Sequence, residues 1–168
     1  MSFQVDLNGY VVKYIQENDI NRLCDLIITN TGFFLNSRTE QKQILLSRVP
    51  LEQPNPFSAI SAAAIHIILN PSPDYQTICQ ILHSSSSSQV QKQAPFHPII
   101  QVVLKGLQEG MLRKVLSESN VLVTLTPVLL FLGSDVTPLH KSSADVLIQA
   151  WKSYPSLVPQ IVLDICIA

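Results

Sequence analysis

The amino-acid sequence predicts an all-α fold. Apolar residues recur at helical spacing from one end of the 168-residue chain to the other. Several prolines follow a polar capping residue and precede an apolar run; a proline opens a helix there without cost, because its missing N–H needs no intrahelical partner. A stretch rich in β-branched residues, Val121–Leu125, has no Asn-Gly or Asp-Gly turn beside it, so a helix is favoured over a strand there too.

Three helices are predicted in the first part of the chain, over residues 5–17, 19–31 and 39–49. The second begins at Asp19, a candidate N-cap. The third follows a capping box of Ser37 and Glu40, in which each side chain would bond a free backbone N–H of the first turn. Pro50 is expected to end it.

Five more helices are predicted to follow, over residues 56–70, 73–83, 98–117, 120–132 and 138–153. Asn55-Pro56 is typical of their starts, with a capping side chain before a proline in the first turn. Gly106 and Gly110 are expected to weaken the helix over 98–117 and to mark a place where it divides.

The chain reads as a single helical domain over residues 1–168, with a flexible Ser/Gln-rich loop at 84–95. A last apolar run continues to Ala168 without a stop signal. We therefore expect the sequence to be the N-terminal part of a longer chain.

Charge is scarce: 14% of residues are charged and 46% are hydrophobic, against about 25% charged in ordinary soluble domains. This composition excludes intrinsic disorder, and a net charge of −1 argues against direct binding of nucleic acid. The runs Ser58–Leu69 and Val121–Leu132 are shorter than the roughly 18 to 20 residues of a membrane span. Asp74 is the one charged residue between Glu52 and Lys92, which indicates surface that is covered by protein.

Cysteine usage indicates an intracellular protein, cytoplasmic or nuclear. The three cysteines, Cys24, Cys79 and Cys166, have no paired spacing, and each lies in an apolar run. They are expected to be buried thiols in a reducing compartment. The first residues carry no signal-peptide pattern.

No motif predicts an enzyme, a cofactor or a metal. Cys79 and His83 stand one helical turn apart, and with His97 they are the best metal candidates, but zinc sites need two close ligand pairs. His140 and Ser143 crowd onto one predicted helix, whereas a nucleophile and its base must converge from different directions. Glycine-rich phosphate loops are absent from the sequence.

Two serines are candidate phosphorylation acceptors. Ser72 precedes a proline, and Ser88 lies in the serine tract and precedes a glutamine.

The succession of short helices, joined by short Pro-marked links with little charge, resembles an armadillo or HEAT type α-solenoid. The resemblance implies stacked antiparallel helical hairpins. The expected pairs are 5–17 with 19–31, 39–49 with 56–70, 73–83 with 98–117, and 120–132 with 138–153. No strict repeat of fixed period is present, so a compact irregular helical bundle is the alternative.

These features favour a non-enzymatic protein–protein interaction scaffold or adaptor subunit of an intracellular multi-protein complex. The expected partners are other protein subunits and the rest of its own chain beyond Ala168. The candidate partner-binding residues lie in the two charge-poor runs and at the end of the helix over 138–153: Ile60, Ile65, Ile68, Val121, Leu125, Leu129, Trp151 and Tyr154. The alternative function is a small regulatory domain that binds a metal, a lipid or a peptide.

Overall fold

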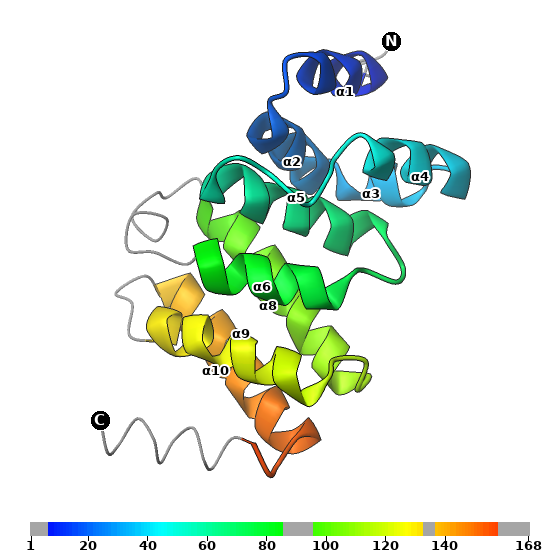
Figure 1. Cartoon of the computed structure of the whole chain (residues 1–168). Helices are drawn as coiled ribbons and strands as arrows, with labels where there is room; N and C mark the ends of the chain where they lie inside the picture. The colour runs from blue at the N-terminus through cyan, green and yellow to red at the C-terminus, as the bar shows by residue number, and fades with distance from the viewer. Residues whose placement is uncertain (1–6, 86–95, 133–136, 158–168) are drawn as a thin grey trace.

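The computed structural model describes residues 7–85, 96–132 and 137–157, and every regular element in these ranges is a helix (Figure 1). The helices are α1 (Leu7–Gln16), α2 (Ile20–Thr29), α3 (Thr31–Leu35), α4 (Thr39–Ser47), α5 (Pro56–Leu69), α6 (Tyr75–Ser85), α8 (His97–Leu112), α9 (Glu118–Leu132) and α10 (Thr137–Ser153). The prediction of an all-α chain is therefore confirmed.

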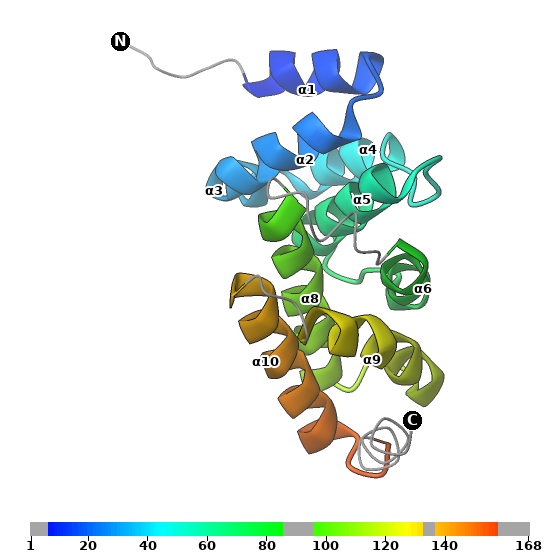
Figure 2. The same cartoon turned by 90° about the vertical axis from the view of Figure 1, so that its left-hand side faces the viewer.

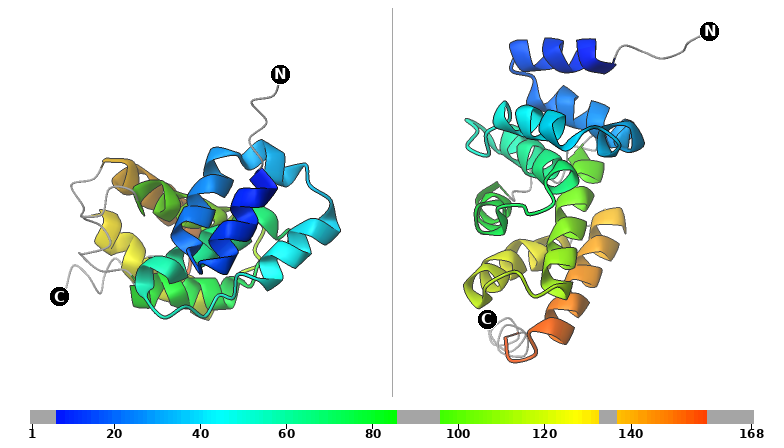
Figure 3. Two further views of the ribbon diagram at one scale, coloured as in Figure 1. Left: turned by 90° about the horizontal axis from the view of Figure 1, so that it is seen from above. Right: turned by 90° about the vertical axis from the view of Figure 1, so that its right-hand side faces the viewer.

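The helices follow chain order from one end of an elongated molecule to the other (Figures 1 and 2). One row of contacts runs from α2 through α5 and α8 to α10, and a second runs from α5 through α6 and α9 to α10. The right panel of Figure 3 shows α1 at one end of the molecule, and its main contact is with α2. All four predicted helix pairs touch, but α4–α5 and α6–α8 do so lightly, and the most extensive contact joins α8 to α10.

Two predicted helix starts are confirmed by their caps. The Asp19 side chain accepts a hydrogen bond from the backbone N–H of Arg22, and Asn55 Oδ1 accepts one from the Ser58 N–H at 2.9 Å. Pro56 stands in the first turn of α5. Local capping chemistry therefore fixes where α2 and α5 begin.

The capping box predicted before α4 does not form. Arg38 is the N-cap residue and makes no side-chain capping bond, whereas Ser37 Oγ donates to the Phe33 carbonyl at 3.2 Å. The reason is α3, a five-residue helix that the sequence did not predict. Its final carbonyls need donors, and Ser37 satisfies one of them.

Helix α8 is continuous through both of its glycines, so the expected division is wrong. A Cβ at Gly106 would lie 2.5 Å from Ile67 Cγ2, and one at Gly110 would collide with Leu116. Glycine is needed at both positions because neighbouring side chains pack directly against the helix backbone. Helix α8 also ends at Leu112, earlier than predicted, and Lys114 follows with a positive φ of 55°.

Helix α5 is the centre of the core. Its consecutive residues Ala59 to Ile65 are buried, and α2, α6 and α8 all pack against it. The small side chains Ala62, Ala63 and Ala64 let these helices approach closely. Ser61 Oγ adds a polar link by donating to Asn21 Oδ1 of α2 at 2.8 Å. The charge-poor run Ser58–Leu69 is thus covered by the chain's own helices.

The predicted serine-rich loop begins later than expected. Helix α6 continues through Ser84 and Ser85, and residues 86–95 lie outside the described part of the chain. Within the described ranges, none of the helices has the length and apolar character needed to cross a membrane.

Candidate functional site

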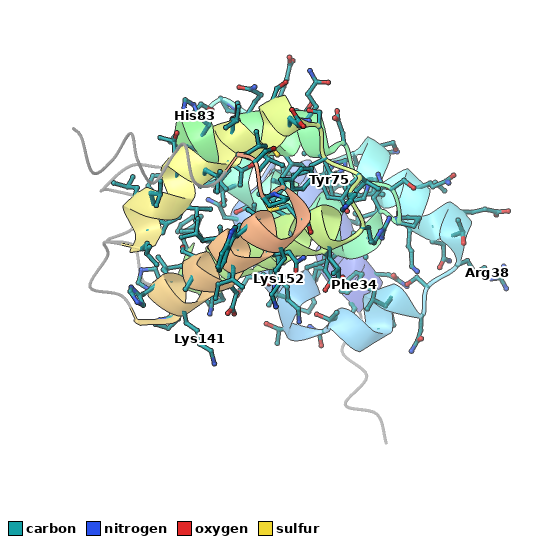
Figure 4. All side chains as sticks on the ribbon, turned by 90° about the horizontal axis from the view of Figure 1, so that it is seen from below. Phe34, Arg38, Tyr75, His83, Lys141 and Lys152 are labelled. Carbon is teal, nitrogen blue, oxygen red and sulfur yellow. The ribbon has the colours of Figure 1, made fainter. Side chains whose placement is uncertain are left out.

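The metal candidates do not form a ligand cluster. Cys79 is buried in α6, His83 is exposed at the outer edge of the molecule (Figure 4), and His97 opens α8. In residues 7–85, 96–132 and 137–157 there is no group of three His, Cys, Asp or Glu side chains that could hold a metal ion. Burial raises the pKa of the Cys79 thiol to about 11, which disfavours the thiolate that binds metals.

The other described cysteine is also a core residue. Cys24 is fully buried in α2. Burial raises the pKa of its thiol to about 12, with a further increase from the negative charge of Asp25. Neither thiol has the exposed, electropositive surroundings of a reactive cysteine. Cys166 lies outside the described residues.

The polar residues of α10 do not form an acyl-transfer site. His140 Nδ1 is 2.7 Å from the Leu132 carbonyl oxygen, so this ring nitrogen is engaged with the end of α9. Ser143 is fully buried, and its hydroxyl has no partner among the described residues. The serine therefore lacks the hydrogen bond to a base that would activate it as a nucleophile.

Of the two candidate phosphorylation sites, Ser72 is exposed in the link between α5 and α6. Its backbone N–H donates to Asn70 Oδ1 at 3.0 Å. It borders a cavity of about 720 Å³ between α4, α5 and α8 that Lys105 and Arg113 also line. Ser88 lies outside the described residues.

The predicted partner-binding residues separate into two groups by exposure. Ile60, Ile65, Val121 and Leu125 are fully buried within the chain. The other four retain exposed surface: Ile68, Leu129, Tyr154 and Trp151.

The two aromatic residues at the end of α10 differ. Trp151 is 59% exposed. Tyr154 is held inward, because its hydroxyl donates to the Leu116 carbonyl at 2.8 Å. Trp151 is therefore the member of the predicted set that is most open to a partner.

A groove at the N-terminal end of the molecule gathers apolar side chains that the sequence analysis did not single out. It encloses about 350 Å³ between α1, α3 and α4, and we call it the α1–α4 groove. Its apolar lining comes mainly from these residues: Val11, Val12, Ile15, Phe33, Phe34, Ile44 and Leu45. Val12, Phe33 and Ile44 are 53%, 47% and 61% exposed, and all three line this one groove.

The groove exists because the short helices around it carry adjacent apolar pairs. Consecutive residues of a helix point about 100° apart. A helix that contacts the core along a narrow strip therefore cannot bury both residues of an adjacent apolar pair. Phe34 is buried while Phe33 is exposed, and Leu45 is buried while Ile44 is exposed. In α1 none of the ten residues is fully buried. Such adjacent pairs in short helices are the sequence signal that could have found the groove.

The charge of the groove is one-sided. Lys42 of α4 and Arg48 at the C-cap of this helix line it, and no Asp or Glu is among its described lining residues. Glu40 of the same helix is exposed but is not part of the lining, and Arg38 points away from the body of the molecule (Figure 4). The groove therefore combines an apolar interior with two cationic groups.

Comparison with known proteins finds no matching protein family, no matching curated protein and no matching solved structure.

Proposed function

We propose that this chain is a non-enzymatic protein–protein interaction scaffold or adaptor subunit of an intracellular multi-protein complex, and that the α1–α4 groove is a surface through which it binds a protein partner. The observation that carries the proposal is the set of large exposed apolar side chains that line this groove, Val12, Phe33 and Ile44. Contiguous apolar surface with a polar rim is characteristic of sites covered by another molecule.

The groove has the dimensions and composition of a binding site. Its volume of about 350 Å³ lies within the roughly 300 to 1,000 Å³ of typical ligand clefts. The buried side chains Phe34 and Leu45 contribute to its lining, and exposed apolar groups surround them. A partner that covers Val12 and Ile44 would remove their side chains from water, and each fully buried side chain of this size contributes about 1.5 to 3 kcal/mol.

We also propose an irregular armadillo or HEAT type arrangement for the chain, as the sequence resemblance implied. Two successive pairs, α6 with α8 and α9 with α10, support it, because α6 contacts α9 and α8 contacts α10. In a stack of this kind each layer covers its neighbour.

The proposal is tested by purifying tagged full-length protein from its native cells, in the unaltered form and as Val12→Asp/Ile44→Asp. We expect a defined partner subunit to co-purify with the unaltered chain and to be lost from the groove variant. The matched control is Ile148→Asp on α10, which is also exposed but lies outside the groove. Equal recovery of every partner by all three forms would refute the proposal, as would recovery of lipid in place of protein.

A further inference from the structure

We propose that the α1–α4 groove binds an amphipathic helix of a partner protein that carries Asp or Glu residues beside its apolar face. This inference rests on the proposed function and specifies the chemistry of the partner. It follows from the shape of the groove, the spacing of its apolar residues and the sign of its charges.

The shape favours a helix as the occupant. Helices α1 and α4 both border the groove: Val11 and Ile15 lie one helical turn apart on α1, and Ile44 of α4 lies on the facing side, with Arg48 at the C-cap of that helix. A helix laid between two such helices meets both with residues at i, i+3, i+4 and i+7. Since α1 has ten residues and spans about 15 Å, a partner segment of about three turns matches its length.

Among the described residues, the apolar face of α1 has little cover beyond its contact with α2. No residue of α1 is fully buried, and its main contact is with α2. Val12 is half exposed although valine is normally a core residue. A helix bound between α1 and α4 would cover Val12 and Ile44 together, which is the contact that the described chain leaves unmade.

The charges specify acidic residues on the partner. Lys42 and Arg48 line the same groove as its apolar residues, and a long cationic side chain can pack its aliphatic stem on apolar surface while its charged end stays in water. No described lining residue offers a carboxylate to either of them. Asp or Glu beside the apolar face of a bound helix would pair with both cations, whereas Lys or Arg there would be repelled.

A membrane surface with acidic lipids offers the same charge but a different shape. Interfacial membrane binding uses an apolar helix face laid on the bilayer plane. Here the apolar residues line a concave space between two helices. The geometry therefore favours a protein helix, and anionic vesicles serve as the competing probe.

The experiment measures binding of labelled peptides to the purified full chain by fluorescence anisotropy. The acidic probe is a capped, helix-forming peptide with Leu at i, i+3, i+4 and i+7 and Glu beside this face. A matched probe has Lys in place of each Glu, and vesicles of phosphatidylserine and phosphatidylcholine are the third ligand. The protein is used unaltered, as Lys42→Glu/Arg48→Glu, as Val12→Asp/Ile44→Asp, and as Ile148→Asp for a control.

We expect the acidic probe to bind the unaltered chain at least about tenfold more tightly than the Lys probe, with the preference reversed in Lys42→Glu/Arg48→Glu. Val12→Asp/Ile44→Asp should lose both probes, and Ile148→Asp should behave as the unaltered chain does. Circular dichroism and thermal unfolding of each variant separate loss of binding from loss of fold.

Three results would overturn the inference. Equal binding of both probes, lost only in Val12→Asp/Ile44→Asp, would show a groove without charge preference and would leave the proposed function standing. Vesicle binding that depends on Lys42 and Arg48, without binding of the acidic probe, would assign the surface to membranes. If none of the three ligands bound, the inference of an acidic helical partner would be wrong. The scaffold function would then be tested separately by the partner purification described above.

Discussion

The N-terminal end of this molecule is packed differently from its centre. Around α5 and α8 the helices touch several neighbours, and buried residues such as Ile60 and Leu104 have no exposed surface. Around α1, α3 and α4 the helices are short, their contacts are few, and large apolar side chains such as Val12 and Ile44 remain more than half exposed. The same apolar residue types thus hold the fold together at one place and form a surface available to a partner at the other.

The difference follows from the number of neighbours a helix has, not from its composition. Helix α5 is contacted by α2, α6 and α8, so most of its circumference is covered. Helix α1 has one main neighbour, α2, which covers only one face. An apolar helix with one neighbour keeps part of its apolar surface in contact with water. Burial of this surface under a second molecule would lower the free energy.

The largest expected effect compares equivalent truncations in the two regions. Ile60→Ala removes a fully buried side chain from α5 and should lower the free energy of unfolding by about 3 kcal/mol. Ile44→Ala removes an exposed side chain from α4 and should change it by less than about 0.5 kcal/mol. Urea unfolding of both variants measures this. Equal losses would show that α4 is packed as tightly as α5.

Alkaline pH tests whether α2 belongs to the densely packed region. The pKa values of Cys24 and Cys79 are raised from 9.0 to about 12 and about 11, so the unfolded chain loses these thiol protons before the folded one does. The unfolded state binds fewer protons above pH 9, and stability must therefore fall as the pH rises between about 9 and 12.

From pH 8 to pH 10 the two thiols should together lower the free energy of unfolding by roughly 2 to 3 kcal/mol. Urea titrations at both pH values, compared with Cys24→Ala/Cys79→Ala, isolate their contribution from that of lysines and tyrosines. If the unaltered chain and the variant lost the same amount, the burial of these thiols would be disproved.

Replacing a glycine by alanine in each region tests how much space lies beside the helix backbone, in α8 at the centre and in α3 at the N-terminal end. Gly106→Ala in α8 places a methyl group against Ile67 and should cost about 1 to 2 kcal/mol despite the gain in helix propensity. Gly32→Ala in α3 meets no atom within 4 Å and should stabilise the chain by up to about 1 kcal/mol. Thermal unfolding gives both values, and stabilisation by Gly106→Ala would contradict the close contact of α5 and α8.

The smallest expected effect concerns a defect inside the packed region. Ser143 is buried in α10 with a hydroxyl that has no partner among the described residues. Ser143→Ala removes the unsatisfied group and should stabilise the chain by roughly 0.5 to 1 kcal/mol. Thr124→Ala is the matched control, because the buried Thr124 hydroxyl donates to the Asn120 carbonyl at 2.9 Å. Destabilisation by Ser143→Ala would show that the hydroxyl has a partner after all.

Local chemistry made part of the fold predictable. Asp19 and Asn55 cap the helices they were expected to cap, because these bonds involve residues within one turn of each other. Helix α3 was missed because five residues are too few to show a helical period. The continuity of α8 was missed because the role of Gly106 depends on Ile67, which is distant in the sequence.

The candidate site was less predictable than the fold. A lack of charge drew attention to α5, but a helix buried by its own chain and a helix buried by a partner have the same composition. In one adjacent apolar pair of α3 and in one of α4, one residue is buried and the other, Phe33 or Ile44, is exposed. Which of the two is exposed becomes evident only when the neighbours of these helices are known. Adjacent apolar residues in short helices were the sequence pattern that could have predicted the groove. This pattern indicates an exposed apolar surface but does not identify the molecule that covers it.

Hydrogen–deuterium exchange of the full chain, with and without the acidic helical probe, tests the central claim most directly. The structure predicts fast exchange in α1 in the free chain and slow exchange in α5 and α8, because local opening is easiest where few apolar contacts must be broken. On addition of the probe, exchange should slow in α1 and α4 and stay unchanged in α8 and α10. Protection confined to α8, α9 or α10, with α1 and α4 unaffected, would contradict the assignment of the α1–α4 groove as the partner-binding surface.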